Sequence, residues 1–379
     1  AVFVIAGLVL SCGGPPPVTF FDAGGVHGDI VISAEATGIE RFAAEELRTY
    51  LSRMSDKVIE VSDEGKSDKD IHIYVGETAA AGQAGIPSSE PDPLCEGYAV
   101  GRVRDGLVIC GFSDLGSLYG VYAFLEEHGV RWYAPGPLGE VVPEESELVL
   151  GNVRSEEKPD YTYRWIGSNE WSRRNRCNVN LPMEDRTIGV KIWRAFHSFG
   201  DLLHPRDYIE DHPEYFSLVR GRRRQAPPDP RPGDISVHGT QFCTSSPEVV
   251  RTVAVSMGKI LDTDPQIKVI TLGPNDGHGY CDGIRCTALD EKDVPGDQSH
   301  SRRLLLFFNA ASQIIGQTHP DRIVKFGAYH IYTRPPDDPN LKARDNMMIM
   351  IAHYEDYANS HAIGDPESER NARFRSLLD

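Results

Sequence analysis

The hydrophobic residues follow strand and helix periodicities in turn over the first third of the sequence. GDIVIS at residues 28–33 is typical of a strand, and IHIYVGET at residues 71–78 has the β-rich composition of a buried strand. Between them, apolar residues recur every three or four positions from Gly38 to Ser55. This spacing predicts an amphipathic helix.

A hairpin and a second helix are expected next. YAVGRVRDGLVICGFS at residues 98–113 has the alternation of two strands, joined at Asp105-Gly106, a dipeptide that favours two-residue turns. A helix is expected from Leu115 to His128, because a glycine follows as a natural stop. The order strand, helix, three strands and helix predicts a small α/β sandwich domain over residues 18–155, which is large enough for its own core.

Beyond residue 160 the pattern changes to apolar strands that alternate with helices, as in βα units. The predicted helices span Pro247–Asp262 and Leu304–Thr318. The predicted strands are YRWIG (Tyr163–Gly167), the stretch Lys191–His197, KVITLGPND, VKFGAYH and MMIMIAHY.

This alternation predicts a (β/α)8 TIM-type barrel over residues 160–379. The pattern contains about five strands, whereas a closed barrel needs eight strands and about 250 residues. We therefore expect the barrel to be truncated at its C-terminus. The predicted fold class is α/β, with the small sandwich domain followed by this incomplete barrel.

Residues 1–17 have the pattern of an export signal and a tether. AVFVIAGLVLSC is an apolar run that is too short for a membrane-spanning helix, which needs about 20 residues. It fits the core of a signal peptide. The ending Leu-Ser-Cys resembles a bacterial lipobox, so we expect lipidation at Cys12. A buried first strand is the alternative, which the Gly-Gly-Pro-Pro-Pro stretch that follows disfavours. We expect an exported, membrane-anchored lipoprotein in the periplasm or on the cell surface.

The charge balance limits the partners. The formal net charge is −17, and nucleic-acid binding needs a basic face, so we expect no nucleic-acid partner. An acidic surface is compatible with neutral sugars. Contact with a membrane is expected only through the lipid anchor.

The remaining cysteines allow several arrangements. Cys95 and Cys110 can face each other across the predicted hairpin, and Cys281 and Cys286 are close enough for a small loop bridge. With His278, the latter two also form a partial zinc set, but a structural zinc site needs a fourth ligand. We therefore predict bridges or free thiols, with no metal and no cofactor.

Several stretches resemble known families. GVYAFLEEHGVRWYAPGPLGEVVP is similar to the end of the small domain that precedes the barrel in α-glucuronidases and β-hexosaminidases. EDHPEYFSLVRGRR, QFCTSSPEVV and GPNDGHGYCDGIRC together resemble the glycoside-hydrolase-like family called domain of unknown function 4838. The resemblance runs from about Asp29 to the last residue. It implies a barrel fold and a carbohydrate substrate more than a reaction.

Glycosidic cleavage usually needs two carboxyl groups, and barrel active sites lie at the carboxyl ends of strands. Asp276 follows KVITLGP directly, and partial burial there favours the protonated form that a general acid needs. The alternative is that Asn-Asp-Gly is only a turn. In β-hexosaminidases the similar position holds an acidic pair, whereas this sequence has Asn275 before Asp276. The orienting carboxylate is therefore absent, which argues against substrate-assisted cleavage of N-acetylhexosamines. Glu355 is the second candidate, with helix capping as its alternative.

Aromatic and fork-like polar side chains near strand ends are candidates for holding a sugar. Arg164 resembles the sugar-binding arginine of hexosaminidases, with a structural ion pair as the alternative. For His197 the alternative is a hydrogen-bonded core histidine. The predicted substrate-binding residues are Arg164, Trp165, Trp193, His197, Asn275, Tyr329 and Tyr332.

These residues favour a glycoside hydrolase that cleaves a polysaccharide or glycan by carboxylate acid/base catalysis. The competing hypothesis is a non-catalytic glycan-binding surface lipoprotein that uses the barrel as a scaffold.

Overall fold

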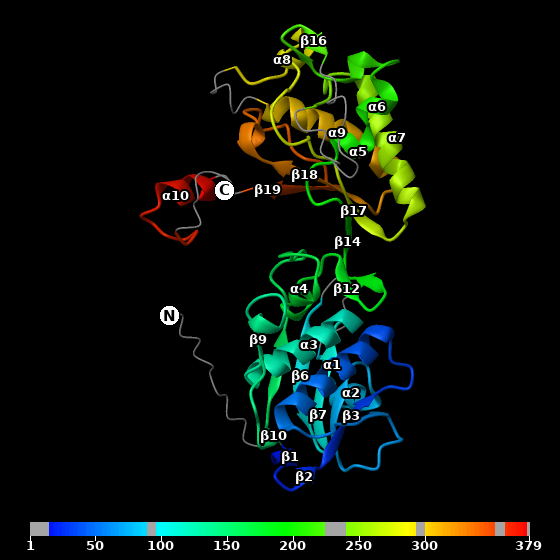
Figure 1. The fold of residues 1–379 in the computed structure, drawn as a ribbon, viewed down its shortest axis with the longest axis vertical. Helices are drawn as coiled ribbons and strands as arrows, with labels where there is room; N and C mark the ends of the chain where they lie inside the picture. The colour runs from blue at the N-terminus through cyan, green and yellow to red at the C-terminus, as the bar shows by residue number, and fades with distance from the viewer. Residues whose placement is uncertain (1–14, 89–95, 224–239, 293–299, 353–360, 377–379) are drawn as a thin grey trace. The chain divides into compact units, whose positions relative to one another are not determined.

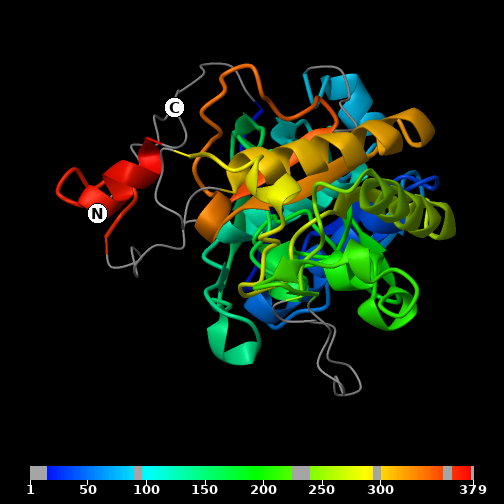
Figure 2. The same cartoon turned by 90° about the horizontal axis from the view of Figure 1, so that it is seen from above.

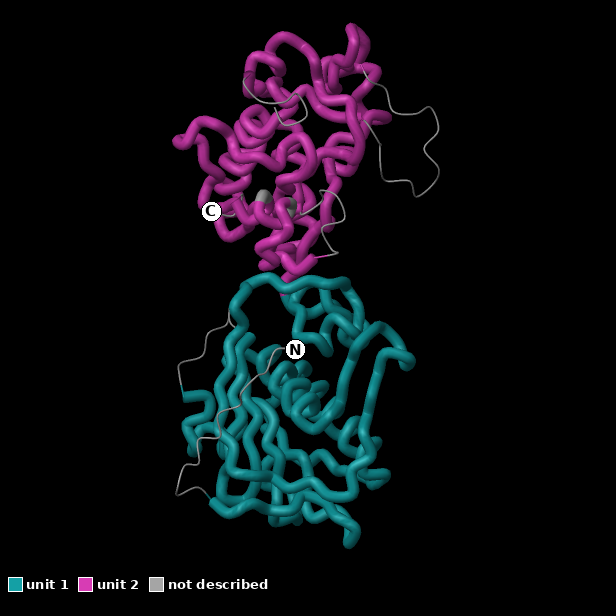
Figure 3. Tube along the Cα trace, turned by 90° about the vertical axis from the view of Figure 1, so that its left-hand side faces the viewer, with its two compact units in different colours: residues 1–189 teal, residues 190–379 magenta. Residues whose placement is uncertain are grey.

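The chain folds into two compact units, residues 1–189 and residues 190–379 (Figure 3). No helix in the part of the chain covered by the structure is long and apolar enough to cross a lipid bilayer. The computed structural model describes residues 15–88, 96–223, 240–292, 300–352 and 361–376.

Unit 1 contains a mixed sheet of six strands within its described residues, in the order β11-β6-β7-β5-β3-β4. β3, β4, β5 and β7 run parallel, whereas β6 pairs antiparallel with β7 and with β11. The predicted hairpin and the two earlier strands are confirmed, while β4 is an addition. The strands are β3 Gly28–Ile32, β4 Val61–Asp63, β5 Ile71–Val75, β6 Tyr98–Val103, β7 Gly106–Gly111 and β11 Arg154–Glu157.

Two helices cover one face of this sheet, as Figure 1 shows. α1 spans Gly38–Ser55 as predicted and begins with a capping box, in which the Thr37 side chain and the Glu40 side chain bond to each other's backbone amides. α3 spans Asp114–Glu127 and begins at the N-cap Ser113. The local capping signals therefore set both helix starts.

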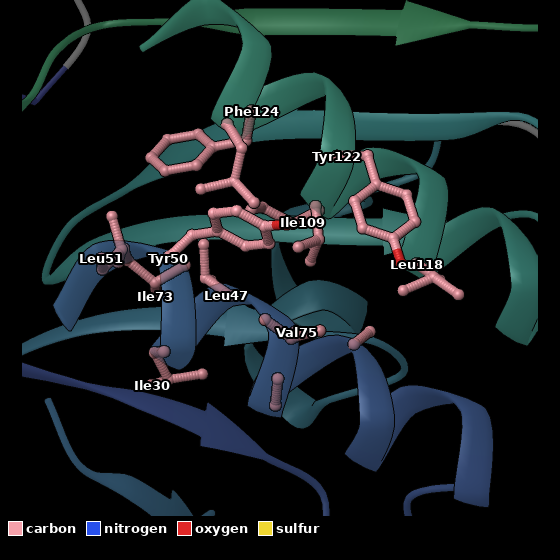
Figure 4. Close-up of a cluster of buried hydrophobic side chains, with 14 of the residues drawn as sticks. Ile30, Leu47, Tyr50, Leu51, Ile73, Val75, Ile109, Leu118, Tyr122 and Phe124 are labelled. Carbon is pink, nitrogen blue, oxygen red and sulfur yellow. The ribbon is translucent and has the colours of Figure 1, made fainter. Parts of the chain in front are cut away.

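The core of unit 1 lies between these helices and the sheet (Figure 4). Leu47 and Tyr50 of α1 and Tyr122 of α3 are at most 1% exposed, and they pack over Ile73 and Ile109 of the sheet. The alternate strand residues point to the opposite face, where α2 (Ala79–Ala84) packs. Successive side chains along each strand point to opposite faces of the sheet, and helices pack on both faces. Unit 1 is therefore a layered α/β sandwich.

Shorter elements complete unit 1. They form small sheets, one 3-10 helix and one short α-helix. They are β1 Val18–Asp22, β2 Gly25–Val26, β8 Arg131–Trp132, η1 Pro137–Gly139, β9 Glu140–Val141, β10 Leu148–Leu150, α4 Glu170–Arg174, β12 Leu181–Met183 and β13 Arg186–Ile188.

The predicted first barrel strand at Tyr163–Gly167 is wrong. This stretch has no strand hydrogen bonds and belongs to unit 1. The Asn178 side chain accepts from the Arg164 amide at 2.8 Å, and the Asn178 amide donates to the Arg164 carbonyl at 3.0 Å. Because the backbone amide and carbonyl of Arg164 bond to Asn178, they are not available to a neighbouring strand. The second unit accordingly follows Gly189 rather than residue 160.

Unit 2 is built on four parallel strands within its described residues, and their order in the sheet is their order in the sequence. The strands predicted around residues 191, 268, 324 and 347 are confirmed. They are β14 Lys191–Trp193, β17 Ile267–Thr271, β18 Ile323–Ala328 and β19 Met347–Ile351.

Two long helices lie side by side against this sheet (Figures 1 and 2). α7 (Pro247–Thr263) leads into β17, and α9 (Ser301–Thr318) leads into β18. Ser246 caps α7 by accepting from the Val249 amide, and a proline occupies the first helical position. Unit 2 therefore has the strand–helix alternation of a barrel, and closure into an eight-stranded barrel stays a prediction.

The connections of unit 2 contain several short elements. They are α5 Phe199–Leu202, α6 Pro205–Tyr208, η2 Pro213–Tyr215, β15 Leu218–Val219, β16 Arg222–Arg223, α8 Ile284–Thr287, η4 His330–Tyr332 and α10 Glu369–Arg375.

Candidate active site

The parallel strands of unit 2 place their carboxyl ends on one edge of the sheet. His197 follows β14, Asp276 follows β17, and Tyr329 follows β18 directly. These side chains line one open cavity of about 140 Å³. The residues that line this cavity and carry polar side chains are His197, Asn275, Asp276, His278, Tyr280, Tyr329, His330 and Tyr332. We call it the histidine–tyrosine cavity.

Asp276 occupies the turn after β17 and is partly buried. Its Oδ1 accepts from the Gly277 amide at 2.9 Å, and Gly277 has φ +89°, which favours glycine. The Asn-Asp-Gly segment is thus a turn, and the same turn presents the carboxylate to the cavity. Among the cavity-lining residues that the structure describes, Asp276 is the one carboxylate.

Asn275 holds this turn in place. Its side-chain oxygen accepts from the Gly200 amide at 3.0 Å, and its amide nitrogen donates to the Thr240 carbonyl at 2.7 Å. Gln241 accepts from the Asn275 backbone amide at 3.1 Å and donates to its carbonyl at 2.6 Å. Asn275 is 4% exposed. Its side-chain hydrogen bonds connect the turn after β17 to the segments at Gly200 and Thr240. The role of Asn275 in substrate binding remains a prediction.

His197 faces the cavity with one nitrogen fixed. Its Nδ1 lies 2.7 Å from the Pro274 carbonyl oxygen. Because a carbonyl oxygen only accepts, Nδ1 carries the hydrogen and the neutral ring keeps Nε2 as an acceptor. The side chain is exposed rather than a buried core residue. His197 is therefore positioned to accept a proton or a hydroxyl hydrogen at Nε2.

Two neighbouring tyrosines, Tyr280 and Tyr332, line the cavity. The rings of Tyr280 and Tyr332 meet edge to face at 6.3 Å. Burial is the main reason that the pKa of Tyr280 lies well above its ordinary value, and the neighbouring Tyr332 and the charge of Asp276 raise it further. Burial and Asp276 likewise raise the pKa of Tyr332. Both phenols stay protonated. The Tyr280 hydroxyl donates a hydrogen bond to the Tyr332 hydroxyl, and the Tyr332 hydroxyl is able to donate to a hydroxyl oxygen in the cavity.

A buried polar layer supports Tyr280 from behind. The Arg303 guanidinium lies 6.0 Å from the Tyr280 ring centre, and the His300 ring meets the Tyr280 ring at 5.1 Å. Arg303 also forms an ion pair with Asp290 at 2.9 Å. Burial raises the pKa of the Asp290 carboxyl to about 6 and lowers the pKa of His300 to about 3. This layer fixes the position of Tyr280.

A second hollow of about 210 Å³ adjoins the cavity and shares His197, Tyr329 and Tyr332 with it. Lys325 of β18 lines this hollow, donates to the Ala195 carbonyl and lies 5.6 Å from the Phe196 ring centre. Burial lowers the pKa of Lys325 to about 8. We call this space the lysine hollow.

The other predicted binding residues lie elsewhere. Trp193 packs against the core of unit 2 and does not line the cavity. Arg164 and Trp165 belong to unit 1, where Arg164 forms an ion pair with Glu96 at 2.9 Å. Arg164 thus has the structural ion pair that was the alternative to sugar binding. Cys12, Glu355 and the cysteine at position 95 lie outside the described residues.

The sequence analysis missed Tyr280, and it considered His278 only as a member of a partial zinc set that it did not adopt. His278 instead faces His330, with ring centres 5.7 Å apart, and both line the cavity. Within the described residues the cysteines are free thiols, so the loop bridge between Cys281 and Cys286 does not form. The position of the whole Gly-His-Gly-Tyr stretch after a buried strand was the signal for a binding loop.

Two sequence families together match most of the chain. Residues 134–377 match the family described as domain of unknown function (DUF4838), and residues 26–124 match the glycosyl hydrolase family 67 N-terminus. The chain belongs to the DUF4838 family. None of the curated proteins matches it.

Solved structures of glycoside hydrolases are similar to this family member at low identity. The Flavobacterium johnsoniae chitobiase has a TM-score of 0.47 and 9% identity, and the match covers 90% of this chain and 56% of that one. The family 115 4-O-methyl-α-glucuronidase BtGH115A, described as specific for decorated arabinogalactans, has a TM-score of 0.48 and 15% identity, and the match covers 88% of this chain and 45% of that one. The Bacteroides fragilis β-N-acetylhexosaminidase has a TM-score of 0.44 and 10% identity, and the match covers 89% of this chain and 68% of that one. The chain spans about half the length of the first two.

Proposed function

We propose that unit 2 carries the active site of a glycoside hydrolase, in which Asp276 acts as the general acid. The supporting observation is the convergence of Asp276, His197 and Tyr332 on one cavity at the carboxyl edge of the parallel strands. Aromatic faces bind the apolar face of a sugar ring, and phenol and imidazole groups bind its hydroxyls. The match of unit 1 to the N-terminal domain of family 67 glycosyl hydrolases supports a glycan as the substrate.

In this proposal Asp276 protonates the leaving oxygen of the glycosidic bond, and a second carboxylate completes the reaction. Glu355, which follows β19 in the sequence, is the candidate for that second group. His197 accepts a hydroxyl hydrogen at Nε2, and Tyr332 donates to a sugar hydroxyl oxygen, while Tyr280 donates to Tyr332.

Non-catalytic glycan binding is the second candidate. The observation that favours it is the single carboxylate among the described residues that line the cavity, because acid/base cleavage needs two. Under this alternative the cavity keeps its affinity for sugars and releases no product.

A glycan screen with the protein expressed from its complete gene tests both candidates. For the hydrolase we expect new reducing ends, and Asp276→Asn should lower turnover by at least about 100-fold while binding persists. Asp262→Asn is the matched control, because Asp262 is 74% exposed on α7. Glu355→Gln in the same assay tests the second carboxylate. Unchanged turnover in Asp276→Asn would overturn the assignment, and binding without any product would favour the non-catalytic alternative.

A further inference from the structure

Three cysteines from separate segments of unit 2 meet in one buried cluster. Cys243 precedes α7, Cys281 lies in the loop after β17, and Cys286 lies in α8. Their side chains are 6%, 3% and 1% exposed, respectively. They form a cluster of their own, against which Leu218 packs. None of them lines the histidine–tyrosine cavity.

The sulfur positions have the spacing of a metal site. All three Sγ atoms lie within 4.8 Å of one another, and the Cys243 and Cys286 sulfurs are 3.8 Å apart. A tetrahedral ion with metal–sulfur bonds of about 2.3 Å places two of its sulfur ligands about 3.8 Å apart. The separation far exceeds a disulfide bond length of about 2.05 Å. The Cys243 and Cys286 sulfurs thus have the separation of two ligands of a tetrahedral ion, and the Cys281 sulfur lies within 4.8 Å of both.

Ser245 adds an oxygen to this arrangement. Its Oγ lies 3.1 Å from the Cys286 sulfur and 3.7 Å from the Cys243 sulfur. A zinc-bound oxygen at about 2.0–2.2 Å lies at a similar distance from the sulfur ligands. The Leu218 amide donates to the Cys281 sulfur at 3.4 Å. Such a donor from the surrounding backbone stabilises a metal-bound thiolate.

We propose that Cys243, Cys281 and Cys286 bind a zinc ion as thiolates, with an oxygen at the Ser245 corner as the fourth ligand. Buried thiolates select a thiophilic ion, and zinc favours this tetrahedral geometry. The site differs from the set considered from the sequence, because Cys243 takes the place of His278.

The ion ties the catalytic loop to the segment before α7. Gln241 bonds to the backbone of Asn275 at one end of the loop, and Cys243 joins Cys281 and Cys286 at the other end. The loop between these two attachments contains Asp276. The zinc therefore positions the loop without contacting substrate. Zinc binding is measured without any glycan, so this inference stands apart from the proposed hydrolase activity.

Metal content is the direct test. The full chain, purified under reducing conditions, should contain about one zinc ion by mass spectrometry, and Co²⁺ in its place should produce thiolate-to-metal charge-transfer absorption. Cys243→Ser should weaken zinc retention against a chelator by at least about 100-fold. Cys110→Ser is the matched control, because Cys110 is a buried free thiol of unit 1.

If Cys243→Ser fails to fold, a variant that adds a zinc ligand still tests the proposal. Ser245 is at the proposed fourth corner, with its Oγ 3.1 Å from the Cys286 sulfur and 3.7 Å from the Cys243 sulfur. Ser245→Cys supplies a fourth thiolate there and should strengthen zinc retention by about tenfold, whereas Ser245→Ala should not strengthen it. Failure of the reduced wild-type chain to bind Zn²⁺ or Co²⁺, or a Cys243–Cys286 disulfide in peptide mapping, would overturn the proposal.

Discussion

Each unit contains a cluster of polar side chains, and the two clusters differ in where their hydrogen bonds go. In unit 1, Arg164 donates to Glu96, to the Arg176 carbonyl and to the Tyr161 carbonyl. Asn178 is fully buried and donates to Glu96 and to the Thr162 carbonyl. The polar groups of this cluster bond to one another and to nearby backbone carbonyls, and in this way they hold the loop around Arg164 to the rest of unit 1.

In unit 2, the polar groups of the histidine–tyrosine cavity are held from behind and face an open space. His197 is fixed through Nδ1, Asp276 through the Gly277 amide, and Tyr280 through the layer around Arg303. The comparison teaches that a place near a predicted strand end does not separate Arg164, whose hydrogen bonds are made within unit 1, from His197, which lines a cavity. What separates the two residues is whether their hydrogen-bonding groups are directed to the protein or to an open space.

The largest expected effect comes from breaking the unit 1 cluster. Asn178→Ala removes the hydrogen bonds to the Glu96 carboxylate and leaves a nearly buried charge short of donors. We expect the free energy of unfolding to fall by about 3 kcal/mol. Chemical denaturation measures this loss.

If the cluster is structural, glycan affinity per folded molecule should not change in this variant. Asn340→Ala is the control, because Asn340 is exposed. A loss of stability no larger than that of the control would show that the two clusters do not differ as described.

The lysine hollow gives the next largest effect, because Lys325 is a buried cation in the unit with the open cavity. Burial lowers the pKa of Lys325 from 10.5 to about 8. Below pH 8 both states are protonated, so the folded state carries the full cost of burying the charge. Between pH 8 and 10.5 the unfolded chain binds the extra proton, so this cost fades as the pH rises.

Lys325→Met should therefore raise the free energy of unfolding at pH 7 by about 2 kcal/mol, and the gain should shrink toward pH 10. Denaturation curves at both pH values measure it. Lys268→Met on the exposed side of β17 is the control and should give no such pH dependence. A gain that is equal at both pH values would mean that the charge of Lys325 is not the cause.

The smallest effect on free energy should come from His197. In His197→Asn, the shorter amide keeps a donor for the Pro274 carbonyl and removes the imidazole Nε2 from the cavity. We expect glycan affinity to fall about tenfold, which is about 1.4 kcal/mol, with the stability nearly unchanged. Calorimetric titration with a glycan from the screen measures this.

His27→Asn is the matched control, since His27 is a partly exposed histidine of unit 1 with a carboxylate partner, Asp22. Equal affinities of His197→Asn and this control would show that His197 is structural, like Arg164.

Much of the fold was predictable because it rests on local signals. The capping box at Thr37 and the 3.6-residue period set the bounds of α1, and the Asp105-Gly106 turn set the hairpin. β17 and β18 are apolar runs that follow strongly periodic helices, and this order predicted parallel strands. It could be predicted that Asp276, Tyr329 and Tyr332 lie close together, because the carboxyl ends of parallel strands meet at one edge, and the three residues line one cavity.

The sequence by itself determined the helices, the hairpin and the strand–helix order, because these depend on neighbours a few positions apart. Only the tertiary structure decided that Arg164 bonds to Glu96, that His278 faces His330, and that Cys243 meets Cys281 and Cys286. The physical reason is that these partners come from separate elements, and the packing of those elements sets which polar groups are satisfied internally and which face a cavity.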